Sequence, residues 1–344
     1  MSRLAERNRE ERAVFIQEAS ARLGLLPVIV EKDYWVCWLL GKIFADPHWE
    51  PHLVFKGGTS LSKVFNAIQR FSEDIDLSVS PVLLGHAEIE LDEAPSRSMR
   101  QKLFKRLQNE CAEIVAGRLR DDLELLVRNH LGQRSDGGSW FRYEVDLRTD
   151  SPVLWFDYDS TLPAGGGYII PAVKLEFGSL TDQRPVGRHT IRPMLAQALP
   201  DMQEERDEVV AMEVERTFWE KATILHAEYH RPAAQPIGER FSRHYSDLAE
   251  LWKQPAGPAA IARLDLLAHV ALFKSRFFGS SWANYGEAKP GSLKLAPAAY
   301  RETELRRDYA KMELMFLTPA PGFEEVLETL RDAEARINAL RSDG

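Results

Sequence analysis

Few features of this sequence would suit a secreted, membrane-spanning or disulfide-stabilised protein. It has two cysteines, Cys37 and Cys111, which lie far apart in apolar surroundings and predict neither a disulfide framework nor a zinc site. It has no run of about 18 apolar residues that could span a membrane. The charged segment Met1 to Arg12 lacks the apolar stretch of a secretory signal. We therefore expect a cytoplasmic protein without a membrane segment.

An excess of positive charge is also missing, since the formal net charge is −8. This value argues against a surface covered with basic residues for non-specific nucleic-acid binding. Two local groups of basic residues remain, and each is either an ordinary solvated helix face or a contact surface for RNA. The first consists of Arg97, Arg100, Lys102, Lys105 and Arg106, and the second of Arg301, Arg306, Arg307 and Lys311.

The composition that is present is typical of a globular protein. The 344 residues are 44% hydrophobic and 28% charged, which fits one large domain or two ordinary ones with a sizeable core. Helical periodicity dominates from about Glu213 onward, whereas the preceding half mixes helical and strand patterns. We therefore predict an α+β protein: a mixed β-sheet core with helices in residues 1–210, followed by an all-helical domain in residues 211–344.

Helices and short strands alternate in the first half. The pattern predicts helices over residues 2–23 and 28–44, one that begins at Thr59 with an apolar stripe reaching Ile68, and one over 98–119. It predicts strands over residues 52–55, 74–79, 123–129, 140–148 and 168–177, of which 123–129 and 140–148 form a hairpin. Residues 150–167, closed by Gly165–Gly167, are expected to be irregular, and the Pro- and Gly-rich stretch 181–200 is expected to leave the sheet.

The stretch from Val54 to Lys63 joins a short apolar run to a double glycine and a helix start. Gly57 and Gly58 allow the backbone to approach an anion closely. The unpaired N–H groups of a helix start favour phosphate, and Thr59 or Ser60 can cap the helix or bond a phosphate oxygen. Taken alone, these residues fit a tight turn with a hydroxyl cap more simply than a phosphate site.

Two acids follow this stretch and change the interpretation. Asp74 and Asp76 are two residues apart on a predicted strand, so their carboxylates project from the same face. Two such charges repel each other unless a cation lies between them. Oxygen ligands on a rigid strand suit Mg²⁺. The glycine turn followed by the acid pair therefore predicts a place where a triphosphate and a metal ion meet.

A third carboxylate would allow a second metal ion to activate an attacking hydroxyl. Glu176 lies with Lys174 on the polar face of one predicted strand, and Glu144 and Asp146 share the polar face of another. The spacing leaves these candidates open.

In their order along the chain, these motifs resemble the nucleotidyltransferase core of the AbiEii/AbiGii toxin family (MenT-like). The resemblance spans roughly residues 31 to 248, and the remaining C-terminal segment is similar only in being helical. The matching segments are Glu31–Trp35, Lys56–Leu61, Phe71–Leu77, Lys174–Glu176, Glu215–Lys221 and Arg243–Leu248.

The resemblance implies a metal-dependent enzyme that moves an NMP from an NTP to an acceptor hydroxyl, with Mg²⁺ or Mn²⁺ as cofactor. It implies Asp74 and Asp76 as metal ligands and favours Glu176 over Asp146 as the third carboxylate. Lys221 is expected on the triphosphate, and Asp247 is expected to complete the site, so that the helical domain completes the active-site cleft. The nucleotide-binding residues implied are Lys56, Gly57, Gly58, Thr59, Ser72 and Lys221.

The resemblance further implies the toxin of a toxin–antitoxin or phage-defence pair, with an antitoxin encoded nearby and the end of a tRNA or another RNA as acceptor. We expect any RNA contact to involve Lys102, Lys105, Arg106 and Arg243. A protein or small-molecule acceptor is the first alternative, and a non-catalytic nucleotide-binding protein is the second.

Overall fold

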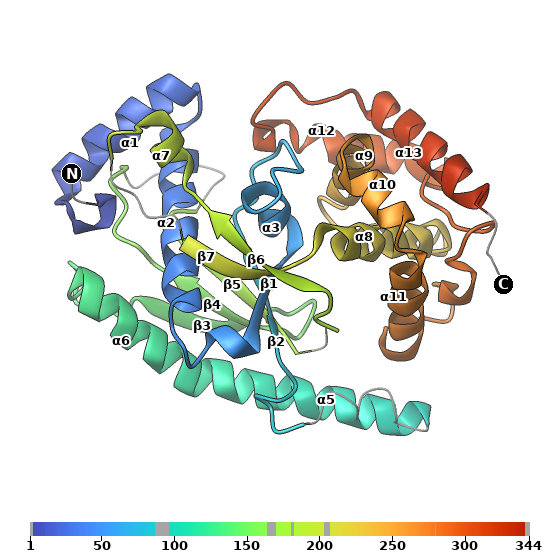
Figure 1. The fold of residues 1–344 in the computed structure, drawn as a ribbon, viewed down its shortest axis with the longest axis horizontal. Coiled ribbons are helices and arrows are strands. Elements are labelled where there is room, and N and C mark those ends of the chain that lie inside the picture. Colours follow the sequence, from blue (N-terminus) through green and yellow to red (C-terminus); the bar gives the residue numbers. More distant parts are fainter. Residues whose placement is uncertain are drawn as a thin grey trace. The chain divides into compact units, whose positions relative to one another are not determined.

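The computed structural model describes residues 3–86, 96–163, 170–179, 182–202, 207–278 and 280–340. The predicted Gly165–Gly167 turn and the side chain of Arg97 lie outside what is described. Two compact units account for the chain (Figure 1). The first comprises residues 1–64, 72–94 and 102–211, and the second comprises residues 65–71, 95–101 and 212–344.

The first unit is built on a seven-stranded mixed sheet with the order β3-β4-β5-β2-β1-β7-β6. Its centre is formed by β1 and β2, which are antiparallel, and by β5, which runs parallel to β2. The strands are β1 (Leu53–Lys56), β2 (Ile75–Val79), β3 (Phe141–Val145), β4 (Pro152–Phe156), β5 (Val173–Gly178), β6 (Val186–Ile191) and β7 (Asp207–Met212).

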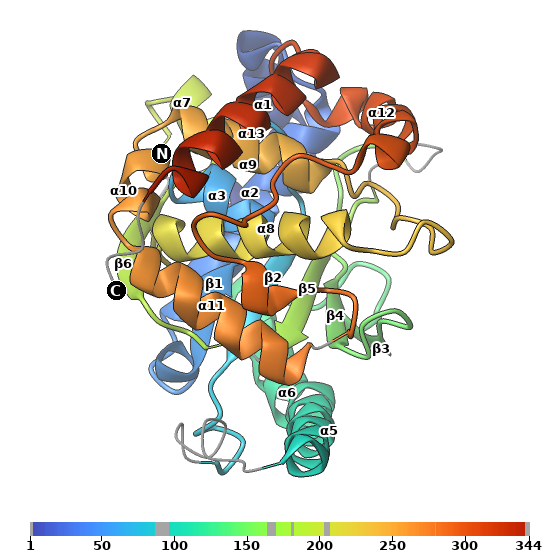
Figure 2. The same cartoon turned by 90° about the vertical axis from the view of Figure 1, so that its right-hand side faces the viewer.

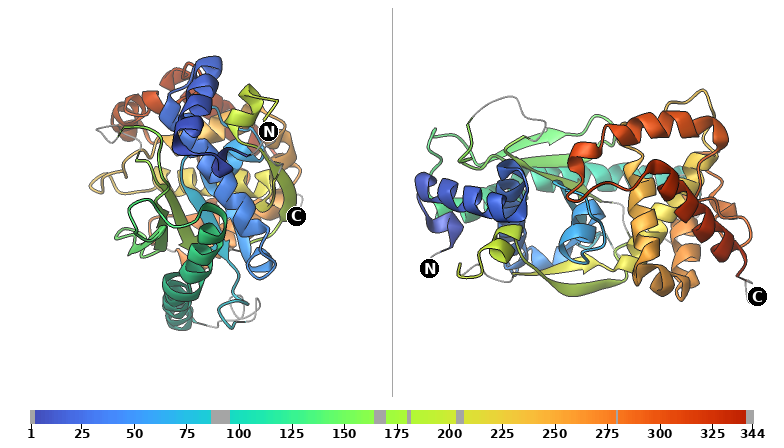
Figure 3. Two further views of the ribbon diagram at one scale, coloured as in Figure 1. Left: turned by 90° about the vertical axis from the view of Figure 1, so that its left-hand side faces the viewer. Right: turned by 90° about the horizontal axis from the view of Figure 1, so that it is seen from above.

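Helices α1 (Arg9–Leu23), α2 (Pro27–Phe44) and α7 (Met194–Ala198) pack against one another beside this sheet. The left view of Figure 3 shows α1 and α2 in blue. Pro27 occupies the first turn of α2, as predicted, and nearly all of α2 is buried. The α1 helix begins at Arg9 because Asn8 caps it, its Oδ1 accepting from the Glu11 N–H at 2.9 Å.

The predicted strand over residues 123–129 is wrong. These residues belong to α6 (Arg120–Leu131), which continues α5 (Arg97–Ile114) through a π-helical turn, Val115–Leu119 (Figure 1). Leu119, Leu123 and Val127 are buried at a spacing of four, which is the period of one helix face. The hairpin partner of β3 is therefore β4, within the stretch that was predicted to be irregular.

Two further predictions for this unit are corrected. The helix after the glycines, α3 (Gly57–Lys63), begins at the glycines themselves and ends before Val64, so the predicted apolar stripe does not continue to Ile68. Asn66 adopts a positive φ of 48°, a conformation that a helix interior excludes. The stretch 181–200 returns to the sheet as β6 instead of leaving it.

The second unit is helical, and this outcome confirms the predicted α+β class. Its helices are α8 (Val214–Tyr229), α9 (Arg243–Lys253), α10 (Ala256–Ile261), α11 (Leu264–Phe277), α12 (Glu302–Ala310) and α13 (Phe323–Asn338), which Figure 2 shows from their own side. The α8 helix packs against α9, α10 and α11, and α9 packs against α13. The segment 65–71 joins this unit, where Arg70 forms an isolated β-bridge with Phe316.

Within the described ranges, no single helix is long and apolar enough to cross a membrane. The α1 and α2 helices would meet the length and composition requirement only as a pair, and they are bent by 111° at their junction.

Candidate active site

Three of the predicted acids come together on the central strands of the first unit. Asp76 of β2 is the direct neighbour of Glu176 on the parallel strand β5. Neighbouring residues in a ladder point to the same face of the sheet, so the two carboxylates project side by side. Asp74 immediately precedes β2 and lies close enough to Glu176 for their charges to interact.

Gly57 brings the start of α3 against the carboxylate of Asp76. A Cβ atom on Gly57 would lie 1.9 Å from Asp76 Oδ2, and the residue has a φ of +81°. Both the contact and the backbone conformation require glycine here. The glycine motif is thus in direct contact with the acid motif.

The hydroxyl of Thr59 forms hydrogen bonds within the first unit. Thr59 is fully buried, and its Oγ1 donates to the carbonyl oxygen of Asp74 and lies 3.0 Å from Ser72 Oγ. The α3 helix has no side-chain cap, and Ser60 Oγ bonds the Gly57 carbonyl oxygen at 2.9 Å. These bonds fix the backbone on which Asp74 stands.

Burial raises the pKa of Asp74, and the neighbouring charges of Glu73 and Glu176 raise this pKa further. Lys174 and Lys32 oppose the shift without overcoming it. Lys32 Nζ is 2.7 Å from Glu73 Oε2 and 3.0 Å from the Ile170 carbonyl oxygen, and its side chain is buried. The acid cluster, defined as Glu73, Asp74, Asp76 and Glu176, therefore carries an excess of negative charge.

The charged residues of α2 each hold a different segment of the first unit. Glu31 accepts from Ser160 Oγ at 2.6 Å and from the Thr161 N–H at 2.7 Å. Asp33 pairs with Lys63 of α3 and accepts from the Met194 N–H at 2.7 Å. Together with the Lys32–Glu73 pair, these bonds anchor the helix after the glycines and the residue before Asp74 to one rigid helix.

Lys174 lies between the two candidates for the third carboxylate. Its Nζ pairs with Glu176 and is 3.3 Å from Asp146 Oδ2. Asp146 Oδ1 also accepts from the Arg148 and Thr149 N–H groups, at 2.9 and 3.1 Å, which fixes the turn between β3 and β4. Asp146 thus has a structural function in that turn, whereas Glu176 is the candidate in register with Asp76.

The acid cluster suits a hard divalent cation in its chemistry. All of its side chains offer oxygen, and the charges of Glu73 and Glu176 act on Asp74 in addition to its burial. Among the described residues, no group of three or more His, Cys, Asp and Glu side chains is arranged to hold a metal ion by itself. A Mg²⁺ or Mn²⁺ ion here would take its remaining ligands from water and phosphate, which is the usual pattern for Mg²⁺.

The second unit brings Lys221 and Asp247 together in a buried ion-pair network. Lys221 Nζ is 2.7 Å from Asp247 Oδ2, and Arg70 holds both carboxylate oxygens, at 2.7 and 2.8 Å. All three side chains are at most 7% exposed. Burial alone would raise the pKa of Asp247, but Arg70 and Lys221 outweigh it and hold this pKa far below its usual range.

Positive charge is in excess in this network. Burial and the charge of Arg70 lower the pKa of Lys221 against the effect of Asp247. Arg243 and His244 lie close by, and burial together with the charges of Lys221 and Arg243 keeps the pKa of His244 well below its ordinary value. We call Arg70, Lys221, Arg243, His244 and Asp247 the basic cluster.

Sequence reasoning missed Arg70 as a site residue. It follows the predicted apolar stripe, which reached Ile68, and nothing in its local pattern marks it. Its partner Asp247 is 177 positions away in the chain.

Three of the four residues expected to contact RNA lie together on α5, and the fourth lies on α9. Lys102, Lys105 and Arg106 are exposed on α5, where Arg106 Nε is 2.9 Å from Glu110 Oε1. Arg243 is half-buried and belongs to the basic cluster of the second unit.

Comparison with known proteins identifies the family of this chain. The family model described as the nucleotidyl transferase AbiEii toxin of type IV toxin–antitoxin systems matches residues 38–329. A search of curated proteins finds no match. The fold is similar to that of MenT4, described as a nucleotidyltransferase toxin from Mycobacterium tuberculosis H37Rv, with a TM-score of 0.51 and 16% identity over 96% of this chain and 91% of that chain. Because the family match extends over most of the sequence, the chain belongs to the AbiEii family of nucleotidyltransferase toxins.

Proposed function

We propose that this nucleotidyltransferase moves an NMP from an NTP to a hydroxyl at the end of a tRNA or another RNA, in a reaction that depends on Mg²⁺ or Mn²⁺. In this proposal it acts in the cytoplasm as the toxin of a toxin–antitoxin or phage-defence pair, opposed by an antitoxin encoded nearby. The observation that carries the proposal is the acid cluster, in which Asp76 and Glu176 are ladder neighbours and Asp76 touches Gly57.

Asp74 and Asp76 are the proposed metal ligands. Their carboxylates would hold a divalent ion, which would supply positive charge next to the triphosphate. The burial of Asp74 and the nearby charges of Glu73 and Glu176 support this assignment, because both disfavour its charged form and a cation would oppose them. Lys56, Gly57 and Gly58 are proposed to face the triphosphate, and Thr59 and Ser72 to hold the segment that carries Asp74.

Glu176 is proposed to orient the acceptor hydroxyl or to accept its proton. Lys174 pairs with Glu176, whose position in the ladder sets its carboxylate beside Asp76. Asp146 shares Lys174 but is committed to the β3–β4 turn by two backbone hydrogen bonds. The choice of Glu176 over Asp146 rests on that difference.

Lys221 is proposed to stabilise the pyrophosphate leaving group. Asp247 is then a positioning residue and not a metal ligand, because both of its oxygens accept from Arg70 and one also accepts from Lys221. The proposal that both units serve one nucleotide is supported by the opposite charges of their clusters and by the sequence, in which three residues separate Arg70 from Asp74.

The test is transfer from each of the four α-labelled NTPs, with Mg²⁺, to purified tRNA, total RNA or total protein. We expect label on the RNA end, and we expect Asp74→Asn and Glu176→Gln to lower the rate by about 10²–10³-fold. Asp146→Asn is the matched control for Glu176→Gln and should retain most of the activity.

Three outcomes would contradict parts of the proposal. Undiminished transfer by Asp74→Asn would remove the acid cluster from the mechanism. A larger loss of transfer activity for Asp146→Asn than for Glu176→Gln would make Asp146, and not Glu176, the third carboxylate. Label found only on protein or on a small molecule would favour the alternative acceptors, and tight NTP binding without transfer to any of them would favour a nucleotide-binding function.

A further inference from the structure

A pocket in the first unit lies apart from the acid cluster and is not used by the proposed reaction. Its volume is about 280 Å³, close to the lower end of the usual range for small-molecule sites. Its walls come from the start of α1, from α2, from the end of α6 and from the segments beside β3 and β4. The lining residues that matter are Arg7, Arg12, Trp35, His130, Trp140 and Asp159.

Two guanidinium groups line this pocket, and each has a donor without a hydrogen-bond partner. The Nε atoms of Arg7 and Arg12 are buried and have no hydrogen-bond partner. A buried donor that lacks a partner costs about 1–3 kcal/mol, so an acceptor that enters the pocket would be favoured. Burial lowers the pKa of Arg12, although Asp159 and Glu31 lie near enough to oppose this effect.

The acids around the pocket are largely engaged elsewhere. Asp159 bonds Arg12 through its backbone carbonyl oxygen, at 3.0 Å, while its carboxylate accepts from Ser135 Oγ at 3.2 Å. Glu31 accepts from Ser160 and Thr161, and Glu11 stands 3.9 Å from Arg7 Nη1. Glu6, at the pocket rim, is exposed and accepts from the Arg3 N–H at 3.3 Å.

Aromatic rings supply a flat apolar wall. Trp35 and Trp140 are both 2% exposed and line the pocket. The guanidinium of Arg12 lies over the Trp35 ring, 5.7 Å from its centroid. His130 completes the wall; its Nδ1 lies 2.9 Å from the Leu126 carbonyl oxygen.

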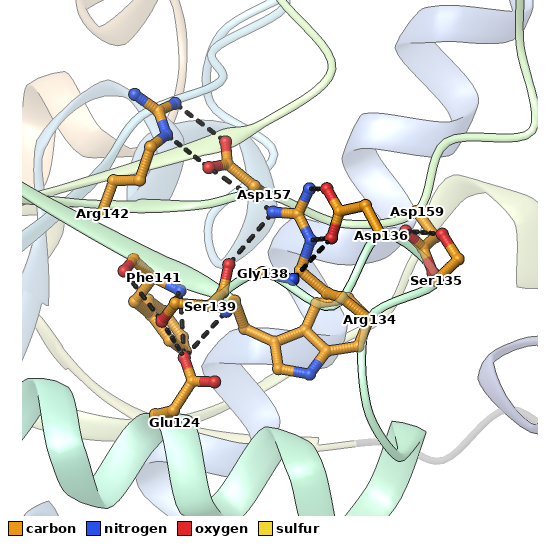
Figure 4. Close-up of polar contacts among 11 residues, drawn as sticks. Glu124, Arg134, Ser135, Asp136, Gly138, Ser139, Phe141, Arg142, Asp157 and Asp159 are labelled. Atoms are coloured by element: carbon orange, nitrogen blue, oxygen red, sulfur yellow. Dashed lines mark hydrogen bonds and ion pairs between the residues drawn. The ribbon is translucent and has the colours of Figure 1, made fainter.

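The wall that carries Trp140 and Asp159 is held by a polar network (Figure 4). Glu124 of α6 accepts from Ser139 Oγ at 2.7 Å and from the Trp140 and Phe141 N–H groups at 2.8 and 3.1 Å. Arg134 pairs with Asp136 at 2.6 Å and donates to the Ser139 carbonyl oxygen at 3.1 Å. A wall fixed in this way is pre-organised, so a ligand would lose little affinity to ordering it.

We propose that this pocket binds a small aromatic anion, a flat ring that carries a carboxylate or phosphate group. The acidic group would accept hydrogen bonds from Arg7 and Arg12, and the ring would lie against Trp35 and Trp140. This binding site goes beyond nucleotidyl transfer and uses none of the residues assigned to that reaction.

Isothermal titration calorimetry on the full chain would test the site with three probes: benzoate, adenosine 5′-monophosphate and inorganic phosphate. We expect a ring-bearing anion to bind at least tenfold more tightly than inorganic phosphate, and the benzoate and nucleotide arms show which acidic group is preferred. Binding of the nucleotide that excess NTP displaces would belong to the nucleotide site and would count against the pocket.

Arg7→Met should raise the Kd of the best probe at least tenfold and leave nucleotidyl transfer unchanged. Arg12→Lys, which keeps a donor for the Asp159 carbonyl, guards against a folding defect and should also weaken binding. Arg22→Met is the matched control on α1, because Arg22 pairs with the exposed Glu18, and it should not alter the Kd.

The proposal is overturned if no probe binds, if inorganic phosphate binds as tightly as the better of the two ring-bearing probes, or if neither Arg7→Met nor Arg12→Lys changes the Kd. These outcomes are independent of the proposed reaction. Asp74→Asn should lower transfer by about 10²–10³-fold and leave binding of the best probe intact.

Discussion

The acid cluster and the basic cluster differ in which charge is in excess. Around Asp74, burial and the charges of two further carboxylates, Glu73 and Glu176, raise the pKa of Asp74. Around Asp247 two cations share one carboxylate, and the pKa of Asp247 falls. Neither arrangement is balanced by its own residues.

This difference distinguishes the acid cluster, which is proposed to bind a charged ligand, from the Arg70–Asp247 pair, which stabilises the fold. The Arg70–Asp247 pair is bidentate and buried, so it stabilises the unit that contains it. Among the residues that the structure describes, no base forms such a bidentate pair with Asp74, so we expect the fold to lose little if that charge is removed. The five predictions below test this contrast, from the largest expected effect to the smallest.

Asp247→Ala should lower the free energy of unfolding by about 3–5 kcal/mol, because it leaves Arg70 and Lys221 buried without their counter-ion. Urea unfolding followed by circular dichroism would measure the change. Asp265→Ala is the matched control in the same unit, since Asp265 is an exposed partner of Arg263, and it should leave stability almost unchanged. Equal effects of the two substitutions would show that the buried network has no special importance.

Lys221→Met should lower the rate of nucleotidyl transfer by about 10²-fold while costing less stability than Asp247→Ala. The reason is that Arg70 keeps both of its bonds to Asp247 when Lys221 is lost. Transfer assays and urea unfolding on the same preparation would separate the two effects. An equal loss of stability in both variants, with activity retained, would make Lys221 structural.

Asp74→Asn should raise the free energy of unfolding by about 0.5–1 kcal/mol, the opposite sign to Asp247→Ala, because it removes one of several crowded like charges. The same unfolding experiment measures it, without added metal. A clear loss of stability would mean that the Asp74 carboxylate is satisfied within the fold, and the contrast between the clusters would fail.

The pH dependence of stability should also have opposite signs at the two aspartates. The pKa of Asp74 is raised above 3.8, so the folded state binds its proton more tightly and stability falls as pH rises through this raised pKa. The pKa of Asp247 is lowered below 3.8, so its contribution is present above pH 3.8 and is lost as pH falls toward the folded-state value.

Unfolding curves collected from about pH 3 to pH 7 would measure the pH dependence of stability for the unmodified protein and for Asp74→Asn. The stability gained by Asp74→Asn should be near zero at the acid end and should grow as the pH rises. A gain that stays constant across the range would contradict the assignment.

Reversal of two exposed charges, Lys102→Glu with Lys105→Glu, should weaken RNA binding by about tenfold at low salt and flatten its salt dependence. Arg331→Glu with Arg336→Glu on α13 changes the net charge equally and serves as the control. Filter binding at several salt concentrations would measure both. Equal weakening by the two pairs would attribute the effect to net charge and not to α5.

Much of the local structure follows from short-range patterns in the sequence. Pro27 begins α2, and the regular apolar spacing in residues 323–337 gives the buried face of α13. The residues 123–129 show the limit of such patterns, because their apolar character fits a strand or a buried helix face. The burial of Leu119, Leu123 and Val127 on one side settled it as a helix.

The sequence by itself determined the chemistry that the glycine and acid motifs could support, because their order and spacing are properties of the chain. It also determined the family, through motifs spread over most of its length. Only the tertiary structure decided which residues are partners. Glu176 became the neighbour of Asp76 through strand register, and Arg70 became the partner of Asp247 across 177 positions. Such contacts depend on how distant segments pack, and no local period in the sequence encodes that packing.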